Sequence, residues 1–135
     1  MADERLIAAL DVPTRADAEQ LVTRLGDSVS CYKVGMELFY ALGGDVVTWL
    51  KEREKKVFLD LKLHDIPNTV GNGLCSLLRL RPDILNVHTA GGLRMMKAAA
   101  EALHRAAAEA DIPCPKLIGV TVLTSMDAED WAGLG

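Results

Sequence analysis

Short apolar runs alternate regularly with longer amphipathic stretches along the whole of this chain. We predict strands in the apolar runs, at residues 6–12, 30–34, 56–62, 84–89 and 117–123. We predict helices in the stretches that follow, at 14–26, 37–54, 67–80 and 93–110, with another beginning near residue 127. Strands that alternate with helices in this way pair in parallel through right-handed crossovers.

Local signals mark the ends of some of these helices. Thr14 is a typical N-cap and Gly26 a typical residue for the end of a helix. Gly43 and Gly44 leave two alternatives for residues 37–54, because they either interrupt one helix or end a shorter one.

Two architectures fit five strands, each followed by a helix. Five such units can complete an open doubly wound sheet, whereas a (β/α)8 barrel needs eight units over roughly 250 residues. In the second case the 135 residues hold about the first five units of the barrel. No linker or low-complexity segment divides the chain, so we treat residues 1–135 as a single domain.

The composition excludes several classes of protein. Half of the residues are hydrophobic and 25% are charged, which is typical of a globular protein. The net charge of -4 argues against a general nucleic-acid binder, although local lysines can still bind an anionic substrate. Three dispersed cysteines, a charged N-terminus and no long apolar run predict a cytoplasmic protein with no signal peptide and no membrane partner.

Polar residues gather where the predicted strands end. They are Asp11, Lys33, Asp60 and Lys62, Asn86 and His88, and Thr121 with Thr124 just after it. Charges inside apolar strands are costly unless they are paired. In both candidate architectures the carboxyl ends of the strands form the ligand site. We therefore expect a functional site at this edge.

Asp60 and Lys62 are the centre of this expected site. They are two residues apart on a strand, so they should point to the same face, where opposite charges keep each other ionised. Lys33 can approach from the neighbouring strand, and Asp65 follows in the loop. Structural salt bridges at a sheet edge are the alternative, but Asp11 and Lys33 at matching strand ends favour a functional charge network.

The same residues carry a resemblance to a known family. Residues 60–69, DLKLHDIPNT, resemble the D-x-K-x-x-D-I-P-N-T signature of orotidine 5′-monophosphate decarboxylases. The resemblance continues in order through residues 9–11, 32–35, 86–88 with 91–92, and 120–125. It implies a (β/α)8 TIM barrel that converts orotidine 5′-monophosphate to uridine 5′-monophosphate in pyrimidine biosynthesis, with no metal and no organic cofactor.

The resemblance also implies a role for individual residues. Lys62 matches the proton donor to C6 of the pyrimidine, and Asp60 matches the carboxylate placed against the departing carboxylate of the substrate. Lys33 matches the lysine that bridges Asp60 and the ribose. Asp11 matches a partner of a ribose hydroxyl, and Thr124 a contact near the pyrimidine.

Other implications concern partners. Asp65, Ile66 and Thr69 match residues that reach into the neighbouring subunit's site, which implies a homodimer with composite active sites. Family members have three further strands, which carry a phosphate-binding glutamine and arginine. We therefore expect either a longer natural protein or a second piece that completes the barrel, and an inactive fragment is the alternative.

Two other functions stay open. Related barrels that act on sugar phosphates with a divalent metal share D-x-K-x-x-D but should differ in residues 66–69. A non-catalytic fragment whose exposed strands pair with another chain is the second possibility. His64 fits site support and packing equally well, and His88 can line the pocket without being a ligand.

Overall fold

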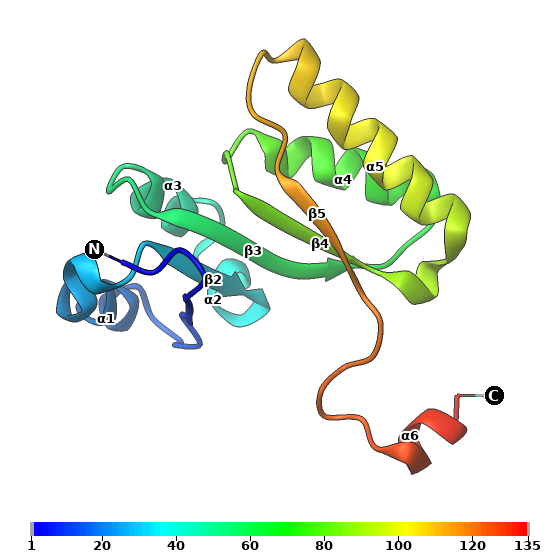
Figure 1. Cartoon of the computed structure of the whole chain (residues 1–135), viewed down its shortest axis with the longest axis horizontal. Helices are drawn as coiled ribbons and strands as arrows, with labels where there is room; N and C mark the ends of the chain where they lie inside the picture. The colour runs from blue at the N-terminus through cyan, green and yellow to red at the C-terminus, as the bar shows by residue number, and fades with distance from the viewer. Residues whose placement is uncertain (1, 135) are drawn as a thin grey trace.

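The computed structural model describes residues 2–134, and these residues form one five-stranded parallel sheet (Figure 1). The strands are β1 (Ile7–Ala9), β2 (Cys31–Gly35), β3 (Lys56–Leu63), β4 (Ile84–His88) and β5 (Lys116–Val120). Their order across the sheet is β1-β2-β3-β4-β5, and every neighbouring pair is parallel. A doubly wound sheet reverses its strand order at a switch point, whereas a barrel wall does not. The sheet therefore has the topology of a barrel wall.

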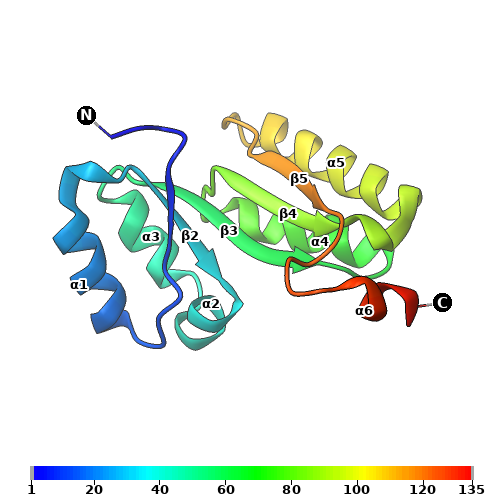
Figure 2. The same ribbon diagram turned by 60° about the horizontal axis from the view of Figure 1, so that its bottom comes forward.

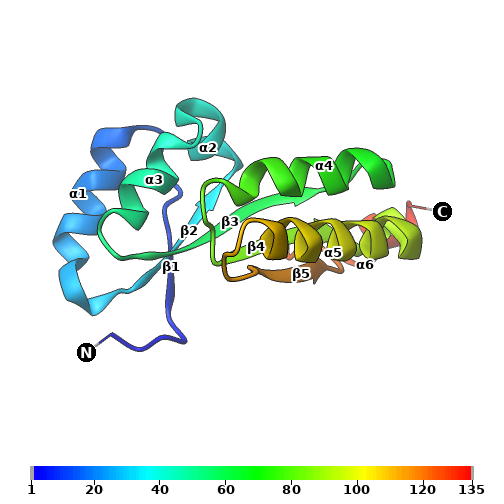
Figure 3. The ribbon, with the colours of Figure 1, turned by 90° about the horizontal axis from the view of Figure 1, so that it is seen from above.

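The helices lie in the stretches where the sequence predicts them. They are α1 (Arg15–Leu25), α2 (Met36–Leu42), α3 (Asp45–Lys51), α4 (Pro67–Leu78), α5 (Gly92–Glu109) and α6 (Ala128–Ala132). Figure 3 shows α1, α2 and α3 beside the first strands, and α4 and α5 together beside the later ones. Figure 2 shows the chain leaving β5 as an extended segment before α6.

The predicted ends of the helices are largely confirmed. The Thr14 hydroxyl accepts the N–H of Asp17 at the start of α1, and Gly26 follows its last residue with φ 51°. Residues 37–54 are two helices, because Gly43 leaves the helical conformation with φ 66° and ends α2. Such a φ is open to glycine at little cost.

The first and last strands are shorter than the sequence predicts. β1 and β5 cover 7–9 and 116–120, whereas the apolar runs extend over 6–12 and 117–123. Each of these strands has a neighbour on only one side in the described sheet. Apolar residues beyond the paired stretch therefore lie outside the hydrogen-bonded ladder.

The hydrophobic core lies between the sheet and its helices. Tyr32, Val34, Val57 and Leu59 are fully buried, and they alternate along β2 and β3 with residues that face the other way. Because side chains alternate on a strand, Lys33, Phe58 and Asn86 belong to the opposite face of the sheet. Parallel pairing puts Lys33 beside Phe58 and Phe58 beside Ile84 on that face. This face carries the candidate site.

Two helices approach each other closely over β3 to β5. A Cβ atom on Gly71 of α4 would lie 3.2 Å from the Cβ of Ala102 on α5, so this contact depends on small residues. Met95, Ala99 and Leu103 continue the buried face of α5. None of the helices described for residues 2–134 is both long enough and apolar enough to cross a membrane.

Candidate active site

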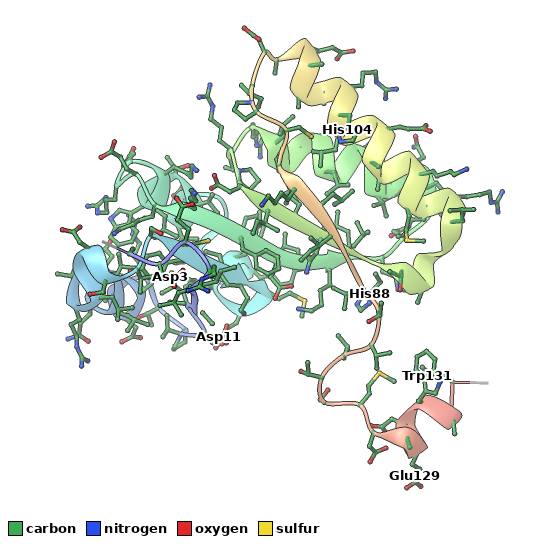
Figure 4. All side chains as sticks on the ribbon, viewed as in Figure 1. Asp3, Asp11, His88, His104, Glu129 and Trp131 are labelled. Carbon is green, nitrogen blue, oxygen red and sulfur yellow. The ribbon has the colours of Figure 1, made fainter. Side chains whose placement is uncertain are left out.

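A pocket of about 210 Å³ opens at the carboxyl ends of the first three strands. Its charged lining consists of Asp11, Lys33, Glu37, Asp60 and Lys62, and Gly35 also lines it. Figure 4 labels Asp11 just after β1 and His88 at the end of β4. The site therefore lies at the edge of the sheet that the sequence indicated.

Four of the predicted residues form one alternating chain of charges. The Lys33 ammonium lies 2.9 Å from Asp11 Oδ1 and 3.8 Å from Asp60 Oδ2. The Lys62 ammonium lies 2.7 Å from Asp60 Oδ1. Each lysine therefore has a carboxylate beside it, and Asp60 contacts both lysines. These contacts bring Asp11, Lys33, Asp60 and Lys62 together, whereas Asp65, which the expected network also included, forms no ion pair among the described residues.

Asp60 is a buried carboxylate that stays ionised. Its side chain is only 10% exposed, and this burial by itself raises the pKa. Hydrogen bonds from Lys62 and Asn86 outweigh that effect, together with the positive charges of Lys62 and Lys33, so the pKa of Asp60 is lowered. A fixed negative charge therefore sits next to the Lys62 ammonium in the pocket.

Lys62 reaches this position by a route that the sequence did not predict. Leu59 pairs with Leu85, but the next β3 residue in register is Leu63, which pairs with Val87. The four residue steps from Leu59 to Leu63 along β3 therefore match only the two residue steps from Leu85 to Val87 along β4, so β3 has a bulge between Leu59 and Leu63. Lys62 has φ 51° in the bulge, a left-handed conformation that costs a residue with a Cβ about 1–2 kcal/mol.

The predicted contact between Asp60 and Lys62 exists, and both residues line the same pocket, but the strand that carries them is not regular. Both residues lie inside the irregular stretch between Leu59 and Leu63, so simple alternation along a regular strand does not by itself account for their contact. Bulges occur beside active sites, where they redirect a side chain. Here the bulge carries the Lys62 ammonium to within 2.7 Å of Asp60.

Asn86, one of the polar residues expected at the strand ends, contacts the charge chain directly, although no role was predicted for it. Its Nδ2 donates to Asp60 Oδ1 at 2.7 Å, and its Oδ1 accepts the backbone N–H of Lys62 at 2.8 Å. The residue is only 1% exposed. One signal was available, because a lone amide in the apolar strand Ile84–His88 must find hydrogen-bond partners when buried.

The remaining predicted residues lie outside this pocket. Asp65, Ile66, Thr69 and Thr124 are all exposed, and Ile66 is exposed to 65%. The Asp65 carboxylate accepts the backbone N–H of Ile66 at 2.6 Å. No ion pair joins Asp65 to Lys62 among the residues that the structure describes. The structure therefore brings together the predicted residues from β1 to β3 but not those from the following loops.

Two histidines flank the same edge of the sheet. The rings of His64 and His88 lie with their centroids 5.5 Å apart and their planes at 47°. His64 and Asp65 border an open hollow beside Ala90 and Gly91, separate from the pocket that holds Asp60. The pair contacts neither carboxylate of the charge chain by a hydrogen bond among the residues described.

Comparison with known proteins identifies close relatives. The chain is 51% identical over 128 residues to the orotidine 5′-phosphate decarboxylase of Moorella thermoacetica, covering 95% of this chain and 51% of that protein. It is 48% identical over 136 residues to the enzyme of the same name from Carboxydothermus hydrogenoformans, covering 98% and 55%. The chain thus spans about half the length of the curated relatives it matches.

Solved structures agree with these relatives. The crystal structure of orotidine 5′-phosphate decarboxylase from Lactobacillus acidophilus matches with a TM-score of 0.86 and 42% identity, covering 96% of this chain and 58% of that one. An uncharacterized conserved protein from Geobacillus kaustophilus matches with a TM-score of 0.86 and 45% identity, covering 93% and 58%. The sheet is thus part of a (β/α)8 TIM barrel. Residues 4–134 match the orotidine 5′-phosphate decarboxylase / HUMPS family, and the chain belongs to it.

Proposed function

We propose that this chain supplies the charged reaction centre of a lyase that decarboxylates orotidine 5′-monophosphate to uridine 5′-monophosphate in pyrimidine biosynthesis, without a cofactor. The observation that carries the proposal is the alternating chain Asp11, Lys33, Asp60 and Lys62 in a pocket at the strand ends. The family membership and the names of the relatives support the same reaction.

The reaction needs a positive charge where an electron pair appears. The bond between C6 and the carboxylate breaks, carbon dioxide leaves, and the electron pair stays on C6. In the proposal the Lys62 ammonium stabilises this carbanion and then gives it a proton, so that a C6–H bond forms. The neutral lysine then takes a proton from water. A charge positioned in advance, in a site with little water, stabilises such a transition state strongly.

The other members of the charge chain have supporting roles. Asp60 holds the Lys62 ammonium 2.7 Å away, and in the proposal its negative charge lies beside the substrate carboxylate that departs. Lys33 bridges Asp60 and Asp11, and in the proposal Lys33 and Asp11 bind the ribose hydroxyls. Thr124 is proposed as a contact near the pyrimidine, reached when the exposed segment after β5 folds towards the pocket.

We also propose a cytoplasmic homodimer with composite active sites. Asp65, Ile66 and Thr69 are exposed and lie outside the pocket, so they are available to a second copy of the chain. A carboxylate from the partner copy would give Lys62 a second negative neighbour. Sedimentation equilibrium measures the dimer that this proposal requires, and a monomer at micromolar concentration would contradict it. The three cysteines are unpaired, which fits a reducing compartment.

The decisive test is the substitution Lys62→Ala. We expect kcat for orotidine 5′-monophosphate to fall at least about a thousandfold, because the proton donor and the charge at C6 are lost together. Binding of uridine 5′-monophosphate, measured by calorimetry, should weaken far less. The matched control is Lys56→Ala on the same strand, where the lysine pairs with Glu4 at the opposite end of the sheet. Turnover close to normal in Lys62→Ala would remove Lys62 from the mechanism.

A further inference from the structure

We infer that Asn86 is a positioning residue, whose buried amide holds the Asp60 carboxylate and the Lys62 main chain in one fixed relation. The inference rests on the proposed decarboxylation, since it assigns Asn86 to the geometry of that reaction centre. Asn86 does not line the pocket, so it acts through Asp60 and Lys62.

The first support is that the nitrogen and the oxygen of the Asn86 side-chain amide each form a hydrogen bond within the site. Nδ2 donates to Asp60 Oδ1 at 2.7 Å, while Oδ1 accepts the Lys62 N–H at 2.8 Å. The side chain is 1% exposed, so water does not compete for these bonds. Removing the amide would leave a buried N–H and a buried carboxylate oxygen each without one partner.

The second support comes from the bulge. Lys62 has φ 51°, which a lysine adopts only when its surroundings impose it. The hydrogen bond from its N–H to Asn86 is a restraint on this backbone that comes from a different strand. Without it we expect the bulge to relax, and the Lys62 ammonium would then leave the place that the reaction needs.

The third support is the orientation of the Asp60 carboxylate. Lys62 Nζ and Asn86 Nδ2 both converge on Oδ1, at 2.7 Å each. Oδ2 is left to face Lys33 at 3.8 Å. The charged groups that contact Asp60 are thus Lys62 on β3 and Lys33 on β2, with Asp11 beyond Lys33, and Glu37 of α2 lines the same pocket. From β4 the neutral amide of Asn86 donates, so it orients the carboxylate without changing the charge balance.

Two substitutions separate the functions of the amide. Asn86→Asp keeps an acceptor for the Lys62 N–H but replaces the donor to Asp60 with a second negative charge. Asn86→Leu has nearly the same shape and removes both hydrogen bonds. Gln20→Glu is the matched control, because it makes the same change of amide to carboxylate at an exposed position of α1.

Three measurements are made on each protein: kcat and KM for orotidine 5′-monophosphate, the free energy of unfolding in urea, and the titration of the Asp60 carboxyl by ¹³C NMR. We expect kcat to fall roughly a hundredfold in Asn86→Asp and in Asn86→Leu, as for a small misplacement of reacting groups. KM should change by less than about tenfold, because the ribose contacts remain. The pKa of the Asp60 carboxyl should rise in both Asn86 variants and stay unchanged in Gln20→Glu.

The outcomes distinguish this inference from the proposed function. If either Asn86 variant lost stability but kept both its kcat and its Asp60 titration, Asn86 would be only a structural residue and the inference would be overturned. If the unaltered protein failed to decarboxylate orotidine 5′-monophosphate, the proposed function would fall. The titration of Asp60 in the variants would then decide the positioning role by itself, and an unshifted midpoint would refute it.

Discussion

Asp60 shows how a single residue combines signals that the sequence carries only in part. Its charge inside an apolar strand marks it as costly and therefore as a candidate for a site. The residues that keep it ionised come from three strands, with Lys33 on β2, Lys62 on β3 and Asn86 on β4. The two lysines could be predicted, because a charged side chain in an apolar strand is costly unless it is paired. Asn86 was also among the polar residues at the strand ends, but its hydrogen bonds to Asp60 and Lys62 were not predictable, because they depend on which strand pairs with β3.

Asp60 should also make the fold sensitive to acid. Its pKa in the folded protein lies below the value of about 3.9 expected in the unfolded chain. Its ionisation therefore stabilises the fold above that pH, and this stabilisation is lost as the pH falls through the lower folded-state pKa. The difference in free energy of unfolding between the native protein and Asp60→Asn should thus narrow from about pH 5 to about pH 2.

Urea unfolding at a series of pH values measures this difference. Asp27→Asn is the control, because Asp27 is exposed and contributes no ion pair among the described residues. If the difference in free energy of unfolding between the native protein and Asp60→Asn were instead the same at every pH, that result would show that Asp60 does not ionise at an unusually low pH.

At the scale of elements, local chemistry explains where the helices begin and end. Thr14 caps α1 through its hydroxyl, and Gly43 ends α2 with a positive φ. Both features depend on neighbouring residues only, which is why the sequence revealed them. The bulge in β3 is different, because it depends on the register between β3 and β4. The sequence predicts a regular strand over residues 56–62, and nothing within that segment indicates the two extra residues of the bulge.

The cap of α1 offers a quantitative test at this scale. Thr14→Ala should lower the free energy of unfolding by about 1 kcal/mol, because the N–H of Asp17 loses its acceptor. Thr23→Ala is the control within the same helix, where the hydroxyl bonds the carbonyl of Glu19 and alanine is a good helix former. Chemical denaturation gives both values, and equal effects of the two substitutions would contradict the capping role.

For the whole molecule, the important features are the two outer edges of the sheet. β1 and β5 each pair on one side only within the described sheet, and exposed apolar residues lie near both. They are Leu6 just before β1 and Ile7 in it, and Ile118 in β5 with Val122 and Leu123 just after it. In a closed barrel such edges pair with further strands. The solved relative that matches this chain is longer, since the match covers 58% of it.

The proposed composite site can be tested by mixing inactive variants. Lys62→Ala and Asp65→Ala should each be inactive, but a mixed dimer contains one site in which both residues are native. Random exchange of subunits makes half of the dimers mixed, so about a quarter of the native activity should return. Mixing Lys62→Ala with Lys33→Ala is the control, because both residues belong to one subunit's pocket and no native site can form.

Activity assays and native mass spectrometry follow the same mixtures. If mixed dimers form and no activity returns with Asp65→Ala, Asp65 does not serve the neighbouring subunit. Activity returning in the control mixture would instead mean that one active site takes Lys33 and Lys62 from different subunits.

The sequence by itself determined the order of strands and helices, the edge at which the site lies, and the residues Asp11, Lys33, Asp60 and Lys62. These follow from periodicity along the chain and from the cost of a charge in a strand, which are local properties. Only the tertiary structure decided the order of the strands in the sheet, the bulge that carries Lys62, and the part played by Asn86. The physical reason is that all three depend on hydrogen bonds between segments distant in sequence, such as Asp60 and Asn86, and no local pattern encodes that pairing.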